Sequence, residues 1–392
     1  MGGVENSRKE NSQLRTKIVR ALQISAAGAM VLLAVAALSA VFFGNAVNVD
    51  FIEYWTSGEL IRQHQNPYSQ TIVMQAEKRA GTDLHAPVVM RNPPWSLFLV
   101  APLGYVSLPV AAFVWLLAMI VALVVSVRLL SSGSKPPPII AYVFAPVLYS
   151  AMAGQTPLFF LLGIAVFLHF YKTRPWLAGL ALTLPAIKPH LFFLVWPILL
   201  LECIRTRRWR ILAGGAVGLA VASAISVALV PHIWTDYLSS MRDEHMELHL
   251  MNNVPFALRM LVPGWPVWVQ IAPAVPAALW ALWYWWRHRM RWDWTDHGAL
   301  LLAISVFVSP YSWPFDQVLF LPAILCVCSG PISRRTLGVL IGLSVLAAAM
   351  ILRFPLTSLA YVWTGPAWLL WYLWARKQNA RIEQAAGAPI LV

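Results

Sequence analysis

A short polar and aromatic stretch around residue 50 carries the side chains best suited to chemistry. If a helix starts at Asp50, one stripe of that helix also carries Glu53, Tyr54 and Ser57, at i+3, i+4 and i+7. A carboxylate held in such a place can act as a general base toward a hydroxyl group. Alternatively, Asp50 only caps the helix, with Glu53 as its capping-box partner. The local sequence favours the cap, whereas the rest of the chain favours chemistry.

Other polar residues interrupt apolar runs. Lys188 lies between Pro185 and Pro189, and Asp316 lies in the stretch 309–317 between two apolar runs. Charged groups at membrane depth are costly and usually face a cavity or one another. We therefore expect one cavity, open on one face, that is lined by Asp50, Glu53, Arg91, Gln155, Lys188, His190, Asn252, Asn253, Arg259, Tyr311, Asp316, Gln317 and Arg353.

A metal site is the weaker interpretation of His245, Glu247 and His249. The two histidines are at i and i+4, which would put both on one helix face, but the order H-x-E-x-H is not the metalloprotease H-E-x-x-H. Apolar residues alternate with them, which fits an interfacial segment equally well. The sequence contains no glycine-rich phosphate loop and no nucleotide fingerprint. We expect no metal ion and no cofactor.

The composition is that of a polytopic membrane protein. Of the 392 residues, 59% are hydrophobic and 11% are charged, and 20 Trp and 11 Tyr fit many membrane interfaces. The net charge of +13 does not indicate nucleic acid binding, because most Lys and Arg fall in segments that alternate hydrophobic spans place on the cytoplasmic side. The three cysteines lie in or near spans and predict no disulfide.

The apolar runs predict an all-α helical bundle of roughly 10–12 membrane segments, with both termini cytoplasmic. Residues 1–20 form a cytoplasmic tail, 21–376 a single transmembrane domain and 377–392 a second tail. The run at about 21–43 is too long for a cleaved signal and is expected to stay as an anchor. Segments at about 44–95 and 232–264 lie on the outer face and contain short interfacial helices. The other spans are expected at about 108–130, 137–152, 156–171, 175–203 (two short spans around an unwound centre), 210–231, 266–286, 298–309, 316–329, 336–351 and 358–375.

Sugar transfer from a lipid-linked phosphate donor fits a carboxylate on the outer face with basic residues nearby. The donor's tail needs a groove among helices, its phosphate needs Arg, Lys or backbone donors, and the acceptor hydroxyl needs a base. Attack from the face opposite the phosphate would invert the anomeric centre. Two alternatives remain: a lipid or solute transporter or flippase, and a non-catalytic subunit of an envelope complex. The absence of an internal repeat weighs against a repeat-built transporter.

Six short motifs occur in an order that resembles the polytopic glycosyltransferases of family 87, in the GT-C superfamily. They are Asp50–Gly58, Asn66–Tyr68, Arg91–Pro94 with Ala101–Leu103, Gly154–Thr156, Ile187–Pro189 and Ser309–Trp313. The resemblance implies a GT-C fold with an extracytoplasmic cavity, a polyprenyl-phosphate-sugar donor with mannose the best-known sugar, and Asp50 as general base. One departure leaves the sugar open: related mannosyltransferases continue the last motif with histidines, whereas this chain continues with Pro314, Phe315, Asp316 and Gln317.

Together these observations predict a membrane hexosyltransferase, with mannose the first expectation, acting on a lipid or glycan acceptor among membrane lipids. Asp50 is the expected base. The donor phosphate is expected to bind Lys188, Arg259, Arg91 and Arg353. Sugar and acceptor are expected to contact Glu53, Tyr54, Gln155, His190, Asn253, Tyr311, Asp316 and Gln317.

Overall fold

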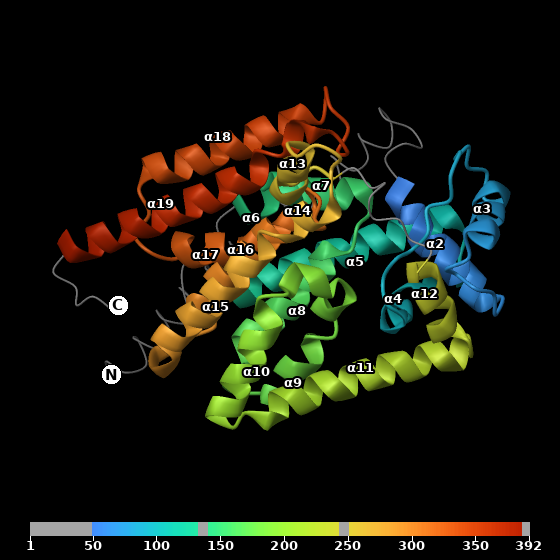
Figure 1. The fold of residues 1–392 in the computed structure, drawn as a ribbon, viewed down its shortest axis with the longest axis horizontal. Helices are drawn as coiled ribbons and strands as arrows, with labels where there is room; N and C mark the ends of the chain where they lie inside the picture. The colour runs from blue at the N-terminus through green and yellow to red at the C-terminus, as the bar shows by residue number, and fades with distance from the viewer. Residues whose placement is uncertain (1–48, 132–139, 243–250, 386–392) are drawn as a thin grey trace, which may run out of the picture.

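The computed structural model describes residues 49–131, 140–242 and 251–385. These residues form helices and connecting turns and contain no strand, so the predicted all-α class is confirmed (Figure 1). The tail at 1–20, the anchor at 21–43 and the candidate metal residues His245, Glu247 and His249 lie outside the described residues.

The stretch around residue 50 is helical as predicted. Helix α2 spans Val49–Arg62 and has Asp50 in its first turn, and α3 spans Gln70–Arg79. Between them, the Tyr68 N–H donates to Asn66 Oδ1 (2.8 Å), and the Tyr68 hydroxyl donates to the Asn92 carbonyl (2.8 Å). The turn therefore fixes α2 and α3 against the segment that precedes the next helices.

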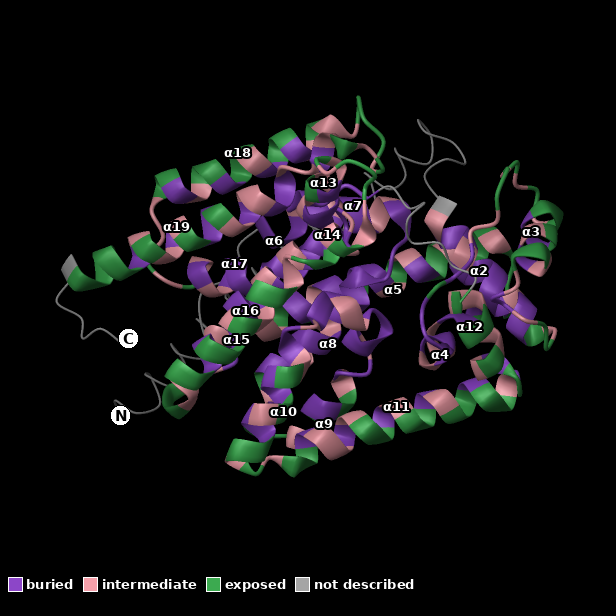
Figure 2. Ribbon diagram, viewed as in Figure 1, coloured by how far each residue is buried: buried purple, intermediate pink, exposed green. Residues whose placement is uncertain are grey.

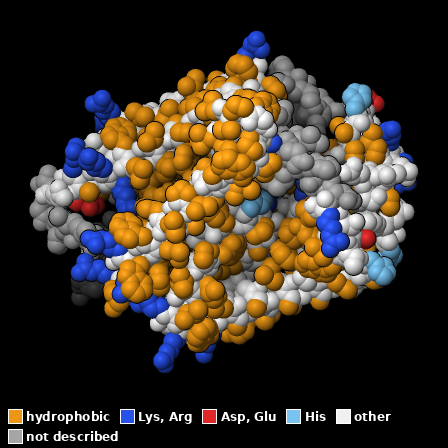
Figure 3. Space-filling view, viewed as in Figure 1, with side chains coloured by type: hydrophobic (Ala, Val, Ile, Leu, Met, Phe, Trp, Pro, Cys, Tyr) orange, Lys and Arg blue, Asp and Glu red, His pale blue; other side chains and the backbone are white. Residues whose placement is uncertain are grey.

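Among the described residues, three helices are long and apolar enough to cross a membrane: α5 (Leu108–Leu130), α11 (Trp209–Leu229) and the run Val267–Arg291, which contains α14 (Val267–Ile271) and α15 (Ala274–His288). Their outward faces keep large apolar side chains exposed, whereas the buried residues gather around α7, α8 and α16 (Figure 2). In Figure 3, hydrophobic side chains cover the middle of the molecule, and Lys and Arg lie mainly at its left and lower-left edges. The total of 10–12 membrane segments stays a prediction.

Shorter elements fill the space between these helices. The part of the expected span 137–152 that is described is not one helix, because α6 (Ile140–Val143) and α7 (Ala145–Ala153) are separated at Phe144. Pro146 lacks an N–H, and its ring would clash with a carbonyl of a continuous helix.

The remaining described elements are short 3₁₀ turns and α-helices. The 3₁₀ turns are Pro94–Ser96, Ala101–Tyr105, Pro185–Ile187, Pro189–Phe192, Arg289–Arg291, Asp316–Phe320 and Leu359–Tyr361. The α-helices are α4 (Leu97–Val100), α8 (Pro157–Phe170), α9 (Pro175–Ala181), α10 (Val195–Thr206), α12 (Ile233–Arg242), α13 (Val254–Met260), α16 (His297–Val308), α17 (Leu321–Cys328), α18 (Arg334–Met350) and α19 (Thr364–Ala385).

Close backbone contacts set the position of α2. A Cβ on Gly58 would lie 2.5 Å from the Val100 carbonyl oxygen and 2.7 Å from the Gly104 nitrogen. No methyl group fits at such distances, so the absence of a side chain at Gly58 lets α2 lie directly against the segment 101–105. Because Asp50 and Tyr54 are on the same helix, this contact also fixes their positions relative to the segment 101–105.

We expect Gly58→Ala to destabilise the protein, because either α2 or the segment 101–105 must move to admit the methyl group. Overpacking of this kind costs about 1–3 kcal/mol. The measurement is the thermal unfolding midpoint of the purified protein. Gly338→Ala in α18 is the matched control, since nothing lies within 4 Å of a Cβ there and the gain in helix propensity is the same. Equal midpoints for the two variants would contradict this account of the contact.

Candidate functional site

Gln155 lies at the centre of a buried polar network. It follows Gly154, which ends α7 with a φ of +67°, a conformation that glycine adopts without strain. The Gly154 carbonyl accepts a hydrogen bond from Trp115 Nε1 of α5 (2.7 Å), and a Cβ on Gly154 would lie 2.8 Å from Phe51 Cβ. The α7–α8 turn is thus held between α2 and α5, which explains the fixed position of Gln155.

Helix α2 contributes the next members of the network. The buried Tyr54 hydroxyl donates to Gln155 Oε1 (2.8 Å), and its ring stacks on Trp115 with centroids 5.3 Å apart. The half-buried Asp50 carboxyl is also hydrogen-bonded to the Gln155 side chain. The predicted stripe therefore exists, and two of its members meet one amide from a turn about a hundred residues away.

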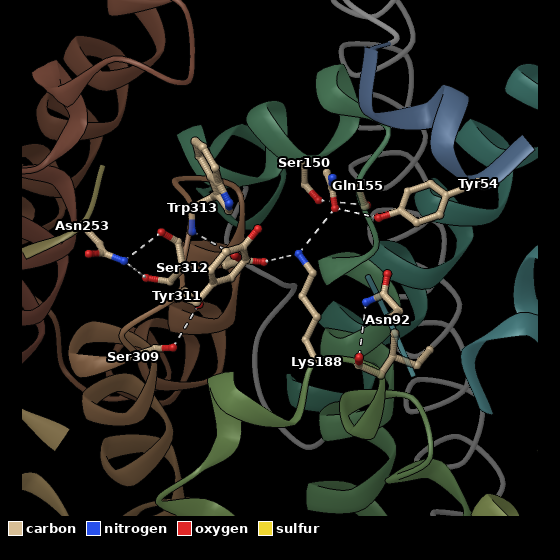
Figure 4. A network of polar contacts seen from close by, with 12 residues as sticks. Tyr54, Asn92, Ser150, Gln155, Lys188, Asn253, Ser309, Tyr311, Ser312 and Trp313 are labelled. Carbon is tan, nitrogen blue, oxygen red and sulfur yellow. Dashed lines mark hydrogen bonds and ion pairs between the residues drawn. The ribbon is translucent and has the colours of Figure 1, made fainter. Parts of the chain in front are cut away.

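Lys188 joins the network from a break in the helical backbone. Its ammonium nitrogen lies 3.2 Å from Asp316 Oδ1, 3.5 Å from Gln155 Oε1 and 5.1 Å from the centre of the Phe315 ring. Asp316 is fully buried, and its second oxygen accepts the Trp313 N–H (2.9 Å). Figure 4 shows Lys188 reaching between the N-terminal helices on one side and the segment 309–313 on the other.

The backbone around Lys188 is not a regular α-helix, but side chains donate hydrogen bonds to carbonyl groups of this segment. Pro185 and Pro189 remove two N–H donors, so nearby carbonyls lose helical partners. Side chains replace them: Asn92 Nδ2 donates to the Ile187 carbonyl (3.3 Å), and Trp95 Nε1 donates to the Ala186 carbonyl (2.9 Å). Neither Asn92 nor Trp95 was predicted to be a site residue, although the motif Arg91–Pro94 contains Asn92 directly before two prolines.

The carboxyl groups of Asp50 and Glu53, both in α2, have raised pKa values. Burial raises the pKa of Asp50, a hydrogen bond with Gln155 and the charge of Lys188 oppose the rise, and the charge of Asp316 adds to it. Burial, followed by the charge of Asp50, raises the pKa of Glu53 to about 8. Glu53 therefore keeps its proton at neutral pH, whereas Asp50 is a stronger base than an exposed aspartate.

The opposite side of the site consists of residues near 310. The rings of His190 and Tyr311 meet edge to face with centroids 5.4 Å apart. Asn253 caps α13 and donates to the Pro310 and Ser312 carbonyls (3.3 and 3.2 Å). A cavity of about 10 Å³, enough for roughly one water molecule, is lined in part by Asn253, Ser312 and Gln317. Gln317 also accepts a hydrogen bond from Trp368 Nε1 (2.9 Å).

The four basic residues expected at the phosphate occupy different places. Lys188 is in the network, and the exposed Arg91 lies close enough to lower the pKa of Glu53 by its charge. Arg259 is buried and donates to the Trp265 carbonyl (2.6 Å) and Gln270 Oε1 (3.1 Å), in the turn between α13 and α14. Arg353 is exposed at the end of α18, with its guanidinium 5.6 Å from the Phe354 ring. Asn252 donates to the carbonyls of Leu356 and Ser358.

Comparison with known proteins identifies the chain by its sequence pattern. The pattern of Glycosyltransferase family 87 matches residues 91–310, which is more than half of the chain and includes Gln155 and Lys188. Asp50 and Asp316 lie outside the matched range. No curated protein and no solved structure matches the chain. The match supports a transferase over the transporter and the non-catalytic subunit. The chain belongs to glycosyltransferase family 87.

Proposed function

We propose that this glycosyltransferase moves a hexose, with mannose the first candidate, from a polyprenyl-phosphate donor to a lipid or glycan acceptor on the extracytoplasmic face. The observation that carries the proposal is the Gln155 side chain, which contacts the carboxyl of Asp50 and the ammonium of Lys188. One amide thus holds a base and a cation a short distance apart, as the two ends of a displacement at an anomeric carbon require.

In this mechanism Asp50 takes the proton of the acceptor hydroxyl. The resulting oxygen attacks the anomeric carbon from the face opposite the phosphate, so that a new C–O bond forms while the bond to the phosphate oxygen breaks. The configuration inverts, and the electron pair leaves with the lipid phosphate. Lys188 offsets the negative charge that develops on this leaving group. The raised pKa of Asp50 strengthens it as a base.

The contacts of Lys188 leave room for a phosphate. An ammonium group has three donors. Asp316 Oδ1 and Gln155 Oε1 lie within reach of two of them, which leaves a third for a donor oxygen. Its contact with Asp316 keeps the lysine side chain aimed into the site when no phosphate is bound. The protonated Glu53 would donate a hydrogen bond to a sugar or acceptor oxygen.

Asp50→Asn should lower the rate of sugar transfer at least about 100-fold, because the amide keeps the shape of the side chain but cannot take a proton. The measurement is the initial rate in membranes supplied with lipid-linked sugar, normalised to the amount of folded protein. Glu59→Gln is the matched control, since Glu59 is a half-buried carboxylate of the same helix that pairs with Arg62. Undiminished transfer by Asp50→Asn would refute its role as base.

A double substitution separates the structural role of Lys188 from its catalytic role. Lys188→Met alone leaves Asp316 buried without its cation, which should cost about 3–5 kcal/mol of stability. Adding Asp316→Asn removes the unpaired charge and should recover most of the loss, measured as the unfolding midpoint. Sugar transfer should not recover, because the phosphate still lacks its cation. Activity that returns together with stability would show that Lys188 is only structural.

The activity should fall as the pH rises through about 8, because Glu53 then loses the proton that it would donate. Glu53→Gln donates through its amide at every pH, so this variant should keep a measurable rate and lose that alkaline decline. The test is the rate at saturating substrates between pH 6 and 10, with Glu59→Gln expected to follow the wild-type curve. An unchanged alkaline decline in Glu53→Gln would assign the titration to another group.

A further inference from the structure

A larger cavity lies where α8 turns into α9 and α10 turns into α11. It has a volume of about 440 Å³. Four basic residues line it, Lys172, Arg207, Arg208 and Arg210, together with the rings of Tyr171 and Trp209. No acidic residue is among the residues that line it. The cavity is therefore positively charged, with aromatic walls.

Two of its arginines are available to a ligand. Arg208 donates to the Tyr171 carbonyl (3.2 Å), and Lys172 pairs with Asp293 (2.6 Å). The side chains of Arg207 and Arg210 are exposed, and neither forms a hydrogen bond or ion pair with a residue that the structure describes. Arg207 also has a φ of +56°, a conformation that is costly for a residue with a Cβ. The start of α11 adds partial positive charge at the same place.

The cavity and the Lys188 network lie at opposite ends of α11. This helix has 21 residues and is about 31 Å long, close to the thickness of the apolar part of a bilayer. Near its C-terminal end, Ser226 donates to the Pro94 carbonyl, and the neighbouring Trp95 holds Ala186 beside Lys188. The residues that line the cavity are at its N-terminal end. That end of α11, where α10 turns into α11, is at the lower left of Figure 1. If α11 crosses the membrane, the two sites face opposite leaflets.

The surroundings of the cavity match the border between apolar and polar parts of a bilayer. Trp209 and Trp176 are 54% and 50% exposed at this end, and Trp side chains prefer that border. Beyond Arg210, the exposed side chains along α9 and α11 are apolar and include Leu180 and Val217. A ligand with a charged head in the cavity could therefore lay acyl chains along these helices. A soluble anion would use only the arginines.

We propose that this cavity binds the phosphate-bearing headgroup of an anionic lipid in the leaflet opposite the Lys188 network. A guanidinium group can donate two parallel hydrogen bonds to the oxygens of one phosphate. Basic cavities at the ends of membrane helices suit such headgroups. The site is distinct from the proposed active site and does not depend on which sugar or acceptor the enzyme uses. Its occupant anchors the α10–α11 turn to the membrane surface.

The test compares lipid retention by purified full-length variants in detergent, counted by native mass spectrometry with added phosphatidylglycerol or phosphatidylcholine. In the cavity variant, Arg207→Asn is combined with Arg210→Gln; asparagine tolerates the left-handed backbone, so the turn should keep its shape. Each arginine contributes roughly fivefold to binding, so this variant should retain phosphatidylglycerol about 25-fold more weakly. Phosphatidylcholine, which has no net charge, should be retained weakly by both proteins.

The matched control combines Arg334→Gln with Arg335→Gln. These arginines are also exposed and start α18, so the change in net charge is the same. The control should retain phosphatidylglycerol like the wild type, and millimolar inorganic phosphate should not displace the lipid. Equal retention by the cavity and control variants would overturn the proposal. Displacement by inorganic phosphate alone would also overturn it and would make the site one for a soluble anion.

Discussion

The buried ion pair between Lys188 and Asp316 is the interaction on which the arrangement of the site depends. Removing two charges from water is expensive, and the pair persists only because each partner has further contacts. Asp316 accepts the Trp313 N–H, and Lys188 lies near Gln155 and the Phe315 ring. A shift of either partner would leave a buried charge without its counterion. The unwound segment, the loop at 309–317 and the α7–α8 turn are therefore positioned together.

Irregular backbone allows the charged side chain of Lys188 to reach the buried interior of the protein. A continuous helix would satisfy its own carbonyls and place Lys188 on a packed surface. The prolines at 185 and 189 prevent this, and the side chains of Asn92 and Trp95 supply the missing donors. Unwound backbone inside an apolar bundle is tolerated only where such partners exist or where it faces a wet cavity. Here the same interruption of the helix frees backbone carbonyls for hydrogen bonds from Asn92 and Trp95 and directs the ammonium group of Lys188 toward Gln155.

The two ends of the molecule differ in how their charges are balanced. At the Lys188 end, acids and a lysine compensate one another inside the protein, which fits a site where charge must develop and be neutralised during a reaction. At the N-terminal end of α11, Arg207 and Arg210 are exposed and pair with no acid among the described residues, which fits attraction to a charged surface. Helix α11, which has 21 residues, runs between these two environments. A Cβ added to Gly179 would lie 2.0 Å from the Ile211 carbonyl oxygen, and this close contact holds α9 along α11.

Patterns within a few residues determined much of this protein from sequence alone. They gave the helical class, the start of α2 near Asp50, the turn at Gly154, the break around Lys188 and the family, because periodicity, prolines and glycines act locally. Which polar side chains of the site contact one another depended instead on tertiary packing. Tyr54 and Gln155 are 101 residues apart, and Lys188 and Asp316 are 128 apart. No local pattern distinguishes Lys188, which enters the network, from Arg353, which lies exposed, because only the packing of distant helices decides which charge is removed from water.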